Sequence, residues 1–185
     1  MEFRLFYRGP LKSNGSIDQK QQIRRDFHKQ LQKLWQQSPL KGFESSLNPE
    51  PKEGEISLVE KVGNFQFVPL VSKRLHAIAR IDILFLRPEE PGAIVTQSGD
   101  IDNRLKTLFD ALRMPKEEKE IPKGDNPKKD ETPFYCVLQD DFLITSFSVI
   151  SDRLLIEADP SEVILIIKIK IDVTELMFDN MGLGG

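Results

Sequence analysis

The sequence predicts an α+β fold: a single domain over residues 1–185, in which a mixed β-sheet carries helices packed on one face. Segments with strand-like and helix-like patterns follow in the order β, α, β, β, α, β, β, which is typical of this class. The last of them, residues 162–175, alternates apolar and polar side chains as a half-buried strand does. The chain length of 185 residues suits one hydrophobic core.

The first strand and the first helix have clear sequence signals. Residues 2–8 predict a strand, because apolar side chains alternate with polar ones. Ser16 is a suitable N-cap for a helix that extends to about Gln37. The apolar positions of this helix follow the spacing i, i+4, i+7, i+8 and are expected in the core: Phe27, Leu31, Leu34 and Trp35.

The rest of the chain divides into strands, one further helix and a polar insertion. After a loop rich in Ser, Pro and Gly, the expected strands are 64–72, 74–88, 142–151 and 162–175, and the expected helix ends near Leu112. Residues 115–133 are rich in Lys, Glu and Pro and have no periodicity, which predicts an exposed, mobile insertion.

Composition excludes several classes of protein. No apolar run reaches the roughly 18 residues of a membrane helix, and the first residues lack the pattern of a signal peptide. Cys136 is the only cysteine, which excludes an internal disulfide and zinc ligation by several cysteines. We therefore expect a cytoplasmic protein with no membrane partner.

The charges are distributed unevenly, although the net charge is only −3. Residues 1–41 contain nine Lys and Arg against three Asp and Glu, whereas residues 154–185 contain two against six. Such asymmetry allows a basic face that contacts nucleic-acid phosphates. The candidates on the first helix are Lys20, Arg24, Arg25 and Lys29, and a purely solvated helix explains the same residues.

The stretch "GDIDNRLKTLFDALRM", residues 99–114, predicts an amphipathic helix with acids at its start. Its apolar stripe faces the sheet: Ile101, Leu105, Leu108 and Leu112. Asp102 and Lys106 lie one turn apart on a second line, and Asp100 lies near the N-cap. Acids at the positive end of the helix dipole explain this stretch as well as a functional site does.

The later stretch "VLQDDFL" favours a site. Asp140 and Asp141 interrupt an apolar run, and burying adjacent like charges costs several kcal/mol unless a positive group compensates. Mg²⁺ is a natural compensator, because it prefers hard oxygen ligands. Asp100, Asp102 and one of this pair would form a three-carboxylate site for phosphodiester hydrolysis. Lys106 would offset charge on the phosphate or orient the attacking water.

These motifs resemble those of the RusA-type Holliday junction resolvases. "GDIDNRLKTLFDAL" is similar to the core motif of that family, "QDD" to its later acidic pair, and "PLKSNG" to its Pro-Ser-Asn segment. The resemblance implies a RusA-like fold and a homodimeric, Mg²⁺-dependent endonuclease, with Mn²⁺ as the alternative cation, that resolves four-way DNA junctions in recombination and repair. It also implies roles for individual residues: Asp100, Asp102 and Asp141 as metal ligands, Lys106 as catalytic lysine, and Asn103 and Asp140 as neighbours that support the site.

The chain departs from the family in two respects. The polar insertion separates the helix from the acidic pair, and the overall charge is acidic, although DNA affinity depends on phosphate neutralisation. Arg104, Arg113 and the lysines of the insertion join the first helix as candidate phosphate contacts. Two alternatives stay open: a non-catalytic relative that binds branched DNA, and a nuclease for other branched or flapped DNA.

Overall fold

The computed structural model describes residues 1–53, 56–88, 101–159, 161–177 and 180–183. Its elements are β1 (Glu2–Pro10), α1 (Ile17–Trp35), η1 (Leu40–Leu47), β2 (Glu60–Val62), β3 (Phe65–Val71), β4 (Ala77–Arg87), α2 (Ile101–Leu112), η3 (Glu118–Glu120), β5 (Phe134–Leu138), η4 (Asp141–Leu143), β6 (Ile144–Arg153) and β7 (Glu162–Val173). The predicted α+β class is confirmed, and every predicted strand and helix has a counterpart.

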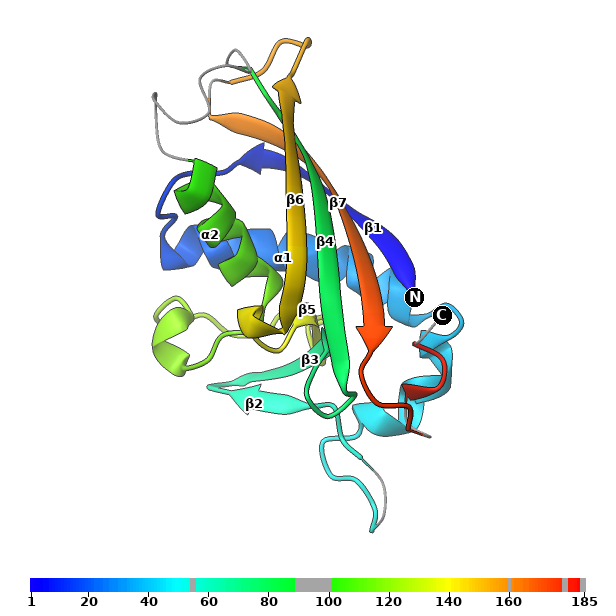
Figure 1. Cartoon of the computed structure of the whole chain (residues 1–185). Helices are drawn as coiled ribbons and strands as arrows, with labels where there is room; N and C mark the ends of the chain where they lie inside the picture. Colours follow the sequence, from blue (N-terminus) through cyan, green and yellow to red (C-terminus); the bar gives the residue numbers. More distant parts are fainter. Residues whose placement is uncertain (54–55, 89–100, 160, 178–179, 184–185) are drawn as a thin grey trace.

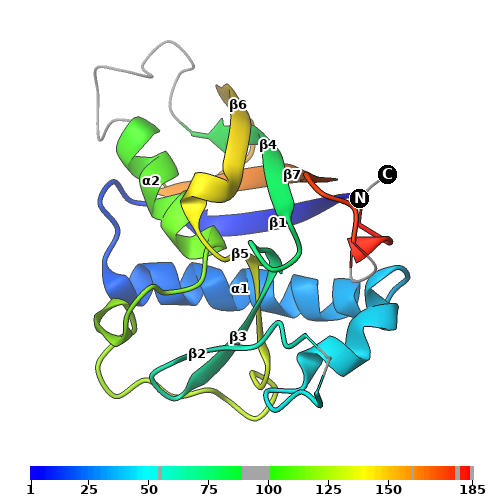
Figure 2. The same ribbon diagram turned by 60° about the horizontal axis from the view of Figure 1, so that its bottom comes forward.

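The strands form two sheets (Figures 1 and 2). Four of them lie in the order β1-β7-β4-β6, with an antiparallel core and a parallel β4–β6 pair, so this sheet is mixed as expected. The short sheet has the order β2-β3-β5. Sequence patterns missed β2, which has three residues, and left open whether "FYCVL", now β5, is a strand. β5 is buried throughout, so it has no alternation to reveal it.

Helix α1 lies between the two sheets (Figure 2). Its N-cap is Ser16, whose hydroxyl accepts the Gln19 N–H at 3.2 Å, as predicted. The apolar stripe is buried, and Trp35 stacks on Tyr135 of β5 at a ring separation of 5.3 Å. Both helices therefore pack on the inner face of the four-stranded sheet, which confirms the predicted layering.

The insertion over 115–133 is described throughout and is anchored to α1, which corrects the expectation of a mobile segment. Arg25 pairs with Asp125 and Glu131, each at 2.9 Å, and Glu131 is only 5% exposed. Ile121 packs in a small cluster with Phe65 and Phe134. The polar composition hid these anchors, because the stabilising contacts are long-range ion pairs.

None of the helices in the described part of the chain is long and apolar enough to span a lipid bilayer.

Candidate functional site

Helix α2 presents Asp102 and Lys106 to solvent. Leu105, Leu108 and Leu112 are buried on its inner side, so the residues one turn apart on the outer side are exposed. Among the described residues neither Asp102 nor Lys106 has an ion-pair partner. The surface ladder that could have explained these charges is therefore not formed within that part of the chain. Asp110, further along, pairs with Lys20 at 2.7 Å and Arg113 at 2.9 Å.

The acidic pair follows β5, and Gln139 fixes its position. The Gln139 N–H donates to the Val71 carbonyl at 2.8 Å, and its side chain accepts the Lys73 N–H at 2.9 Å. The side-chain amide also donates to Glu60 at 2.6 Å. These three bonds tie the end of β5 to β2 and to the end of β3, which sets where the next two residues begin.

Asp102, Lys106 and Asp141 line one shallow pocket of about 260 Å³. Its remaining walls are apolar: Leu105, Phe109 and Phe147. Phe109 of α2 contacts Phe147 of β6 edge to face, with ring centroids 5.3 Å apart. This contact joins the helix to the strand that follows the acidic pair, and it explains how side chains far apart in the sequence meet.

Asp140 and Asp141 have different surroundings. Asp140 caps η4 by accepting the Phe142 N–H at 3.2 Å, and it pairs with Lys116 at 2.9 Å. Burial acts to raise the pKa of Asp140, but hydrogen bonding with Asp141, Lys116 and the Phe142 N–H lowers it to about 2. Asp141 is 49% exposed and lies 3.5 Å from Lys116. The pocket is therefore lined by Asp141, whereas Asp140 serves the backbone and the lysine.

The donor chemistry of the pocket fits a hard divalent cation. Asp102 and Asp141 supply carboxylate oxygens, which Mg²⁺ prefers. Within the described ranges no three Asp, Glu, His or Cys side chains gather closely enough to hold a metal. Asp100, the third predicted ligand, lies outside the described residues.

The predicted neighbour Asn103 takes part in a backbone link to the N-terminal segment. The Thr107 hydroxyl donates to the Asn103 carbonyl at 3.1 Å and accepts the Gly15 N–H at 2.9 Å. Gly15 belongs to "PLKSNG", which the resemblance singled out. A Cβ at position 15 would lie 2.6 Å from Thr107 Cγ2, so only glycine fits this approach.

The four arginines among the predicted DNA contacts serve the interior instead, so the prediction is wrong for them. Arg24 is 2% exposed and donates to the carbonyls of Asp110 and Arg113. Arg25 holds the insertion, and Arg113 is 7% exposed and pairs with Asp110 and Glu120. Arg104 is also buried, at 7% exposure. A buried guanidinium that already bonds to protein cannot reach a phosphate.

Two basic residues lie near the pocket: Lys116, one of the insertion lysines that the sequence put forward as phosphate contacts, and Lys73, which the sequence did not indicate. Lys116 is 46% exposed beside the acidic pair. Lys73 lies over the ring of Phe142 at 4.6 Å from its centroid. Lys20 is paired with Asp110, and Lys29 is exposed near Asp26 at 3.8 Å. Lys73 comes from a loop without periodicity, so no local pattern indicated that it would lie beside the acidic pair.

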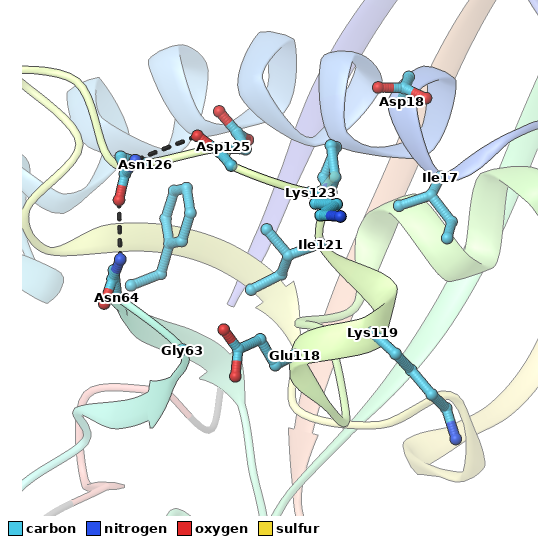
Figure 3. A pocket seen from close by; sticks show the side chains of 13 residues that line it. Ile17, Asp18, Gly63, Asn64, Glu118, Lys119, Ile121, Lys123, Asp125 and Asn126 are labelled. Carbon is cyan, nitrogen blue, oxygen red and sulfur yellow. Dashed lines mark hydrogen bonds between the residues drawn. The ribbon is translucent and has the colours of Figure 1, made fainter.

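A larger pocket of about 590 Å³ contains none of the predicted site residues (Figure 3). It lies between the start of α1, the β2–β3 turn and the insertion. Its walls combine apolar side chains such as Ile121 with both signs of charge, including Glu118 and Lys123. Another pocket, of about 750 Å³, lies between β1 and the start of α1, so size does not single out either of them. Two carboxylates and a lysine in one lining favour the smaller pocket instead.

Comparison with known proteins gives no further guide to the site. No protein-family model matches the chain, and a search of curated proteins finds no match.

Proposed function

We propose that the chain is a Mg²⁺-dependent endonuclease that resolves four-way DNA junctions as a homodimer, in the manner of the RusA-type resolvases it resembles. One observation carries the proposal: Asp141 of η4 lines the same pocket as Asp102 and Lys106 of α2, although about 35 residues of sequence separate them. Convergence of a lysine and carboxylates is the arrangement expected for metal-assisted phosphodiester hydrolysis. Surface charges that serve only solubility have no reason to gather in one pocket in this way.

Each residue of the pocket has a distinct task in this proposal. Asp102 and Asp141, with Asp100, would hold the cation, which supplies Lewis-acid stabilisation of the phosphate and a more acidic bound water. Lys106, one helical turn from Asp102, offsets negative charge on the reacting phosphate. Leu105, Phe109 and Phe147 are apolar, so these three charged side chains are the polar part of the pocket lining.

The surrounding charge supports local contact with DNA rather than a continuous basic groove. Lys73 and Lys116 flank the acidic pair, whereas the buried arginines cannot reach a phosphate. Few phosphate contacts give a shallow dependence of affinity on salt. Recognition would therefore depend on the shape of a branched substrate, which positions one strand in each of two pockets.

A non-catalytic junction-binding protein is the second candidate, and Lys116 favours it. An ammonium group that neutralises the acidic pair from within the chain reduces the attraction for a metal. The two candidates differ in one measurable property, which is cleavage of the junction. Only the first candidate predicts cleavage in the presence of a divalent cation.

The test compares Asp102→Asn with the wild-type chain on a synthetic four-way junction in Mg²⁺. We expect the rate of nicking to fall by about 100-fold or more, because a metal ligand is lost while the helix is retained. Asp18→Asn is the matched control, since Asp18 is exposed in the first turn of α1 and lies away from the pocket. Equal rates for wild type and Asp102→Asn would refute the proposal, and forked and linear duplexes in the same assay measure substrate choice.

A further inference from the structure

One face of the four-stranded sheet is not covered by any described element (Figure 1). Alternation assigns each strand residue to a face, and the inner positions such as Leu5, Ile167 and Ile81 are buried against the helices. The outer positions include Glu2, Arg4, Phe6 and Arg8 of β1, Ile164, Ile166, Lys168, Lys170 and Asp172 of β7, Arg80, Asp82, Leu84 and Leu86 of β4, and Ser146, Ser148, Ile150 and Asp152 of β6.

An apolar row crosses this outer face. The register aligns Phe6, Ile166, Leu84 and Ile150, one residue from each strand. Phe6 is 51% exposed, Ile166 38% and Ile150 66%. Ile164 and Leu86 widen the row on one side. A contiguous apolar patch on a domain surface marks a face that another molecule covers.

The charges around the row indicate a protein partner rather than a nucleic acid. Arg80 pairs with Asp172 at 2.7 Å, and Lys168 lies 3.4 Å from Glu2 and 3.8 Å from Asp82. Both signs are therefore interspersed, whereas a surface for phosphates carries an excess of cations. Such a mixed surface suits a partner with a mixed pattern of its own.

We propose that this outer face is the interface between two copies of the chain, packed sheet against sheet about a twofold axis parallel to the strands and between β7 and β4. The proposed function includes a homodimer, and the proposal of this interface rests on the proposed function in that respect. The choice of surface comes from the sheet itself. Rotation about this axis places β1 over β6 of the partner and β7 over β4 of the partner.

The facing rows are complementary under this rotation. Phe6 meets the partner's Ile150, and Ile166 meets the partner's Leu84, so the apolar row covers itself. In the next row Ile164 meets the partner's Leu86, and Arg8 meets the partner's Asp152. On the other side Lys168 meets the partner's Asp82.

One facing pair is unfavourable, but its charge is balanced within the chain. Lys170 comes opposite the partner's Arg80, which already has Asp172 as its ion-pair partner. Packed sheets are rotated by roughly 30°, so the match is closest near the axis and looser at the outer strands. The apolar contacts at the axis are therefore expected to contribute most of the stability of the dimer.

This arrangement leaves the candidate site open. Phe147, which lines the pocket with Asp102, belongs to the inner face of β6, because it aligns with buried Ile81. Ile150 belongs to the outer face of the same strand. The dimer thus buries one face of the sheet and exposes one pocket in each copy on the other.

Oligomeric state tests the interface without any measurement of cleavage. We expect the wild-type chain to sediment as a dimer at micromolar concentration, and Ile150→Asp to raise the dissociation constant by at least about 10-fold, because a carboxylate would be buried in an apolar row. Ile156→Asp is the control, since Ile156 is 52% exposed but lies beyond β6. A monomeric wild type, or an unchanged dissociation constant for Ile150→Asp, would overturn the interface.

Cross-linking tests the axis. A short bismaleimide is added to the Phe6→Cys protein, to the Ile150→Cys protein and to a mixture of the two. Native Cys136 does not react, because it is buried at 2% exposure. We expect linked dimers chiefly in the mixture, whereas linkage within either protein alone to the same extent would overturn this axis. Failure of the proposed function is distinguishable, because a dimer that cross-links in this way but cleaves no junction contradicts only that function.

Discussion

Asp140 and Asp141 are adjacent and chemically identical, yet their contacts give them different roles. Asp140 accepts a backbone N–H and pairs with Lys116 at 2.9 Å, whereas Asp141 lines the pocket with Asp102. Lys116 comes from the insertion and carries a raised pKa, chiefly because of its hydrogen bond to Asp140. The insertion therefore supplies a cation next to the proposed metal site.

Replacing Lys116 by Met should strengthen metal binding. The ammonium group repels a divalent cation and occupies the acidic pair, so its loss should lower the dissociation constant for Mn²⁺ by about 2- to 5-fold, in keeping with an exposed ion pair. Calorimetric titration measures the change. Lys119→Met is the control, because Lys119 pairs with Glu117 in the same insertion and away from the pocket. A weaker affinity in Lys116→Met would show that the lysine positions the ligands instead.

Among the contacts between elements, a hydrogen bond from the Gly15 N–H to the Thr107 hydroxyl joins the N-terminal segment to α2. Gly15→Ala would bring a Cβ within 2.4 Å of Gln19 Oε1 and 2.6 Å of Thr107 Cγ2. We expect the free energy of unfolding to fall by about 1–3 kcal/mol, as for other overpacked sites. Urea denaturation followed by circular dichroism measures it. Gly42→Ala is the control, because no side chain beyond the adjacent residues would lie within 4 Å of a Cβ there. A similar loss in this variant would contradict the explanation.

At the scale of the whole molecule, His28 joins α1 to β5 and to the insertion. Its Nδ1 accepts the Tyr135 N–H at 2.9 Å, and its Nε2 donates to the Asp130 carbonyl at 3.1 Å, so the bonded ring is neutral. Burial lowers the pKa of His28, and the nearby Asp130 and Glu131 only partly oppose this effect. The second sheet is thus attached through a histidine that must not be protonated.

Stability should therefore fall as the pH drops below about 6.5, the ordinary pKa of histidine in an unfolded chain. Between that value and the lower folded pKa the unfolded state binds more protons, so the slope is at most about 1.4 kcal/mol per pH unit. His28→Gln should remove this slope, whereas His76→Gln should retain it, since the chain has only these two histidines. Denaturation between pH 5 and 8 provides the measurement, and an unchanged slope in His28→Gln would contradict the role given to this residue.

Local sequence patterns were enough to predict two features: the elements whose two faces differ in polarity, and the one-turn spacing of Asp102 and Lys106. The alternation of β7, the stripe of α1 with its Ser16 cap, and the one-turn separation of Asp102 and Lys106 all follow from local periodicity. Such patterns depend on neighbours a few residues away, so they can be interpreted without knowing the fold.

Which charged side chains can reach a ligand depends on long-range packing, which the sequence pattern does not show. Arg24 and Arg25 have the same sequence signature as solvated basic residues, but distant carbonyls and carboxylates bind them in the interior. Three further features could not be predicted from local patterns: the anchoring of the insertion, the position of Asp141 rather than Asp140 at the pocket, and the apolar row on the outer face. These features depend on contacts between residues far apart in the chain, and local patterns contain no information on the distance between such residues in space.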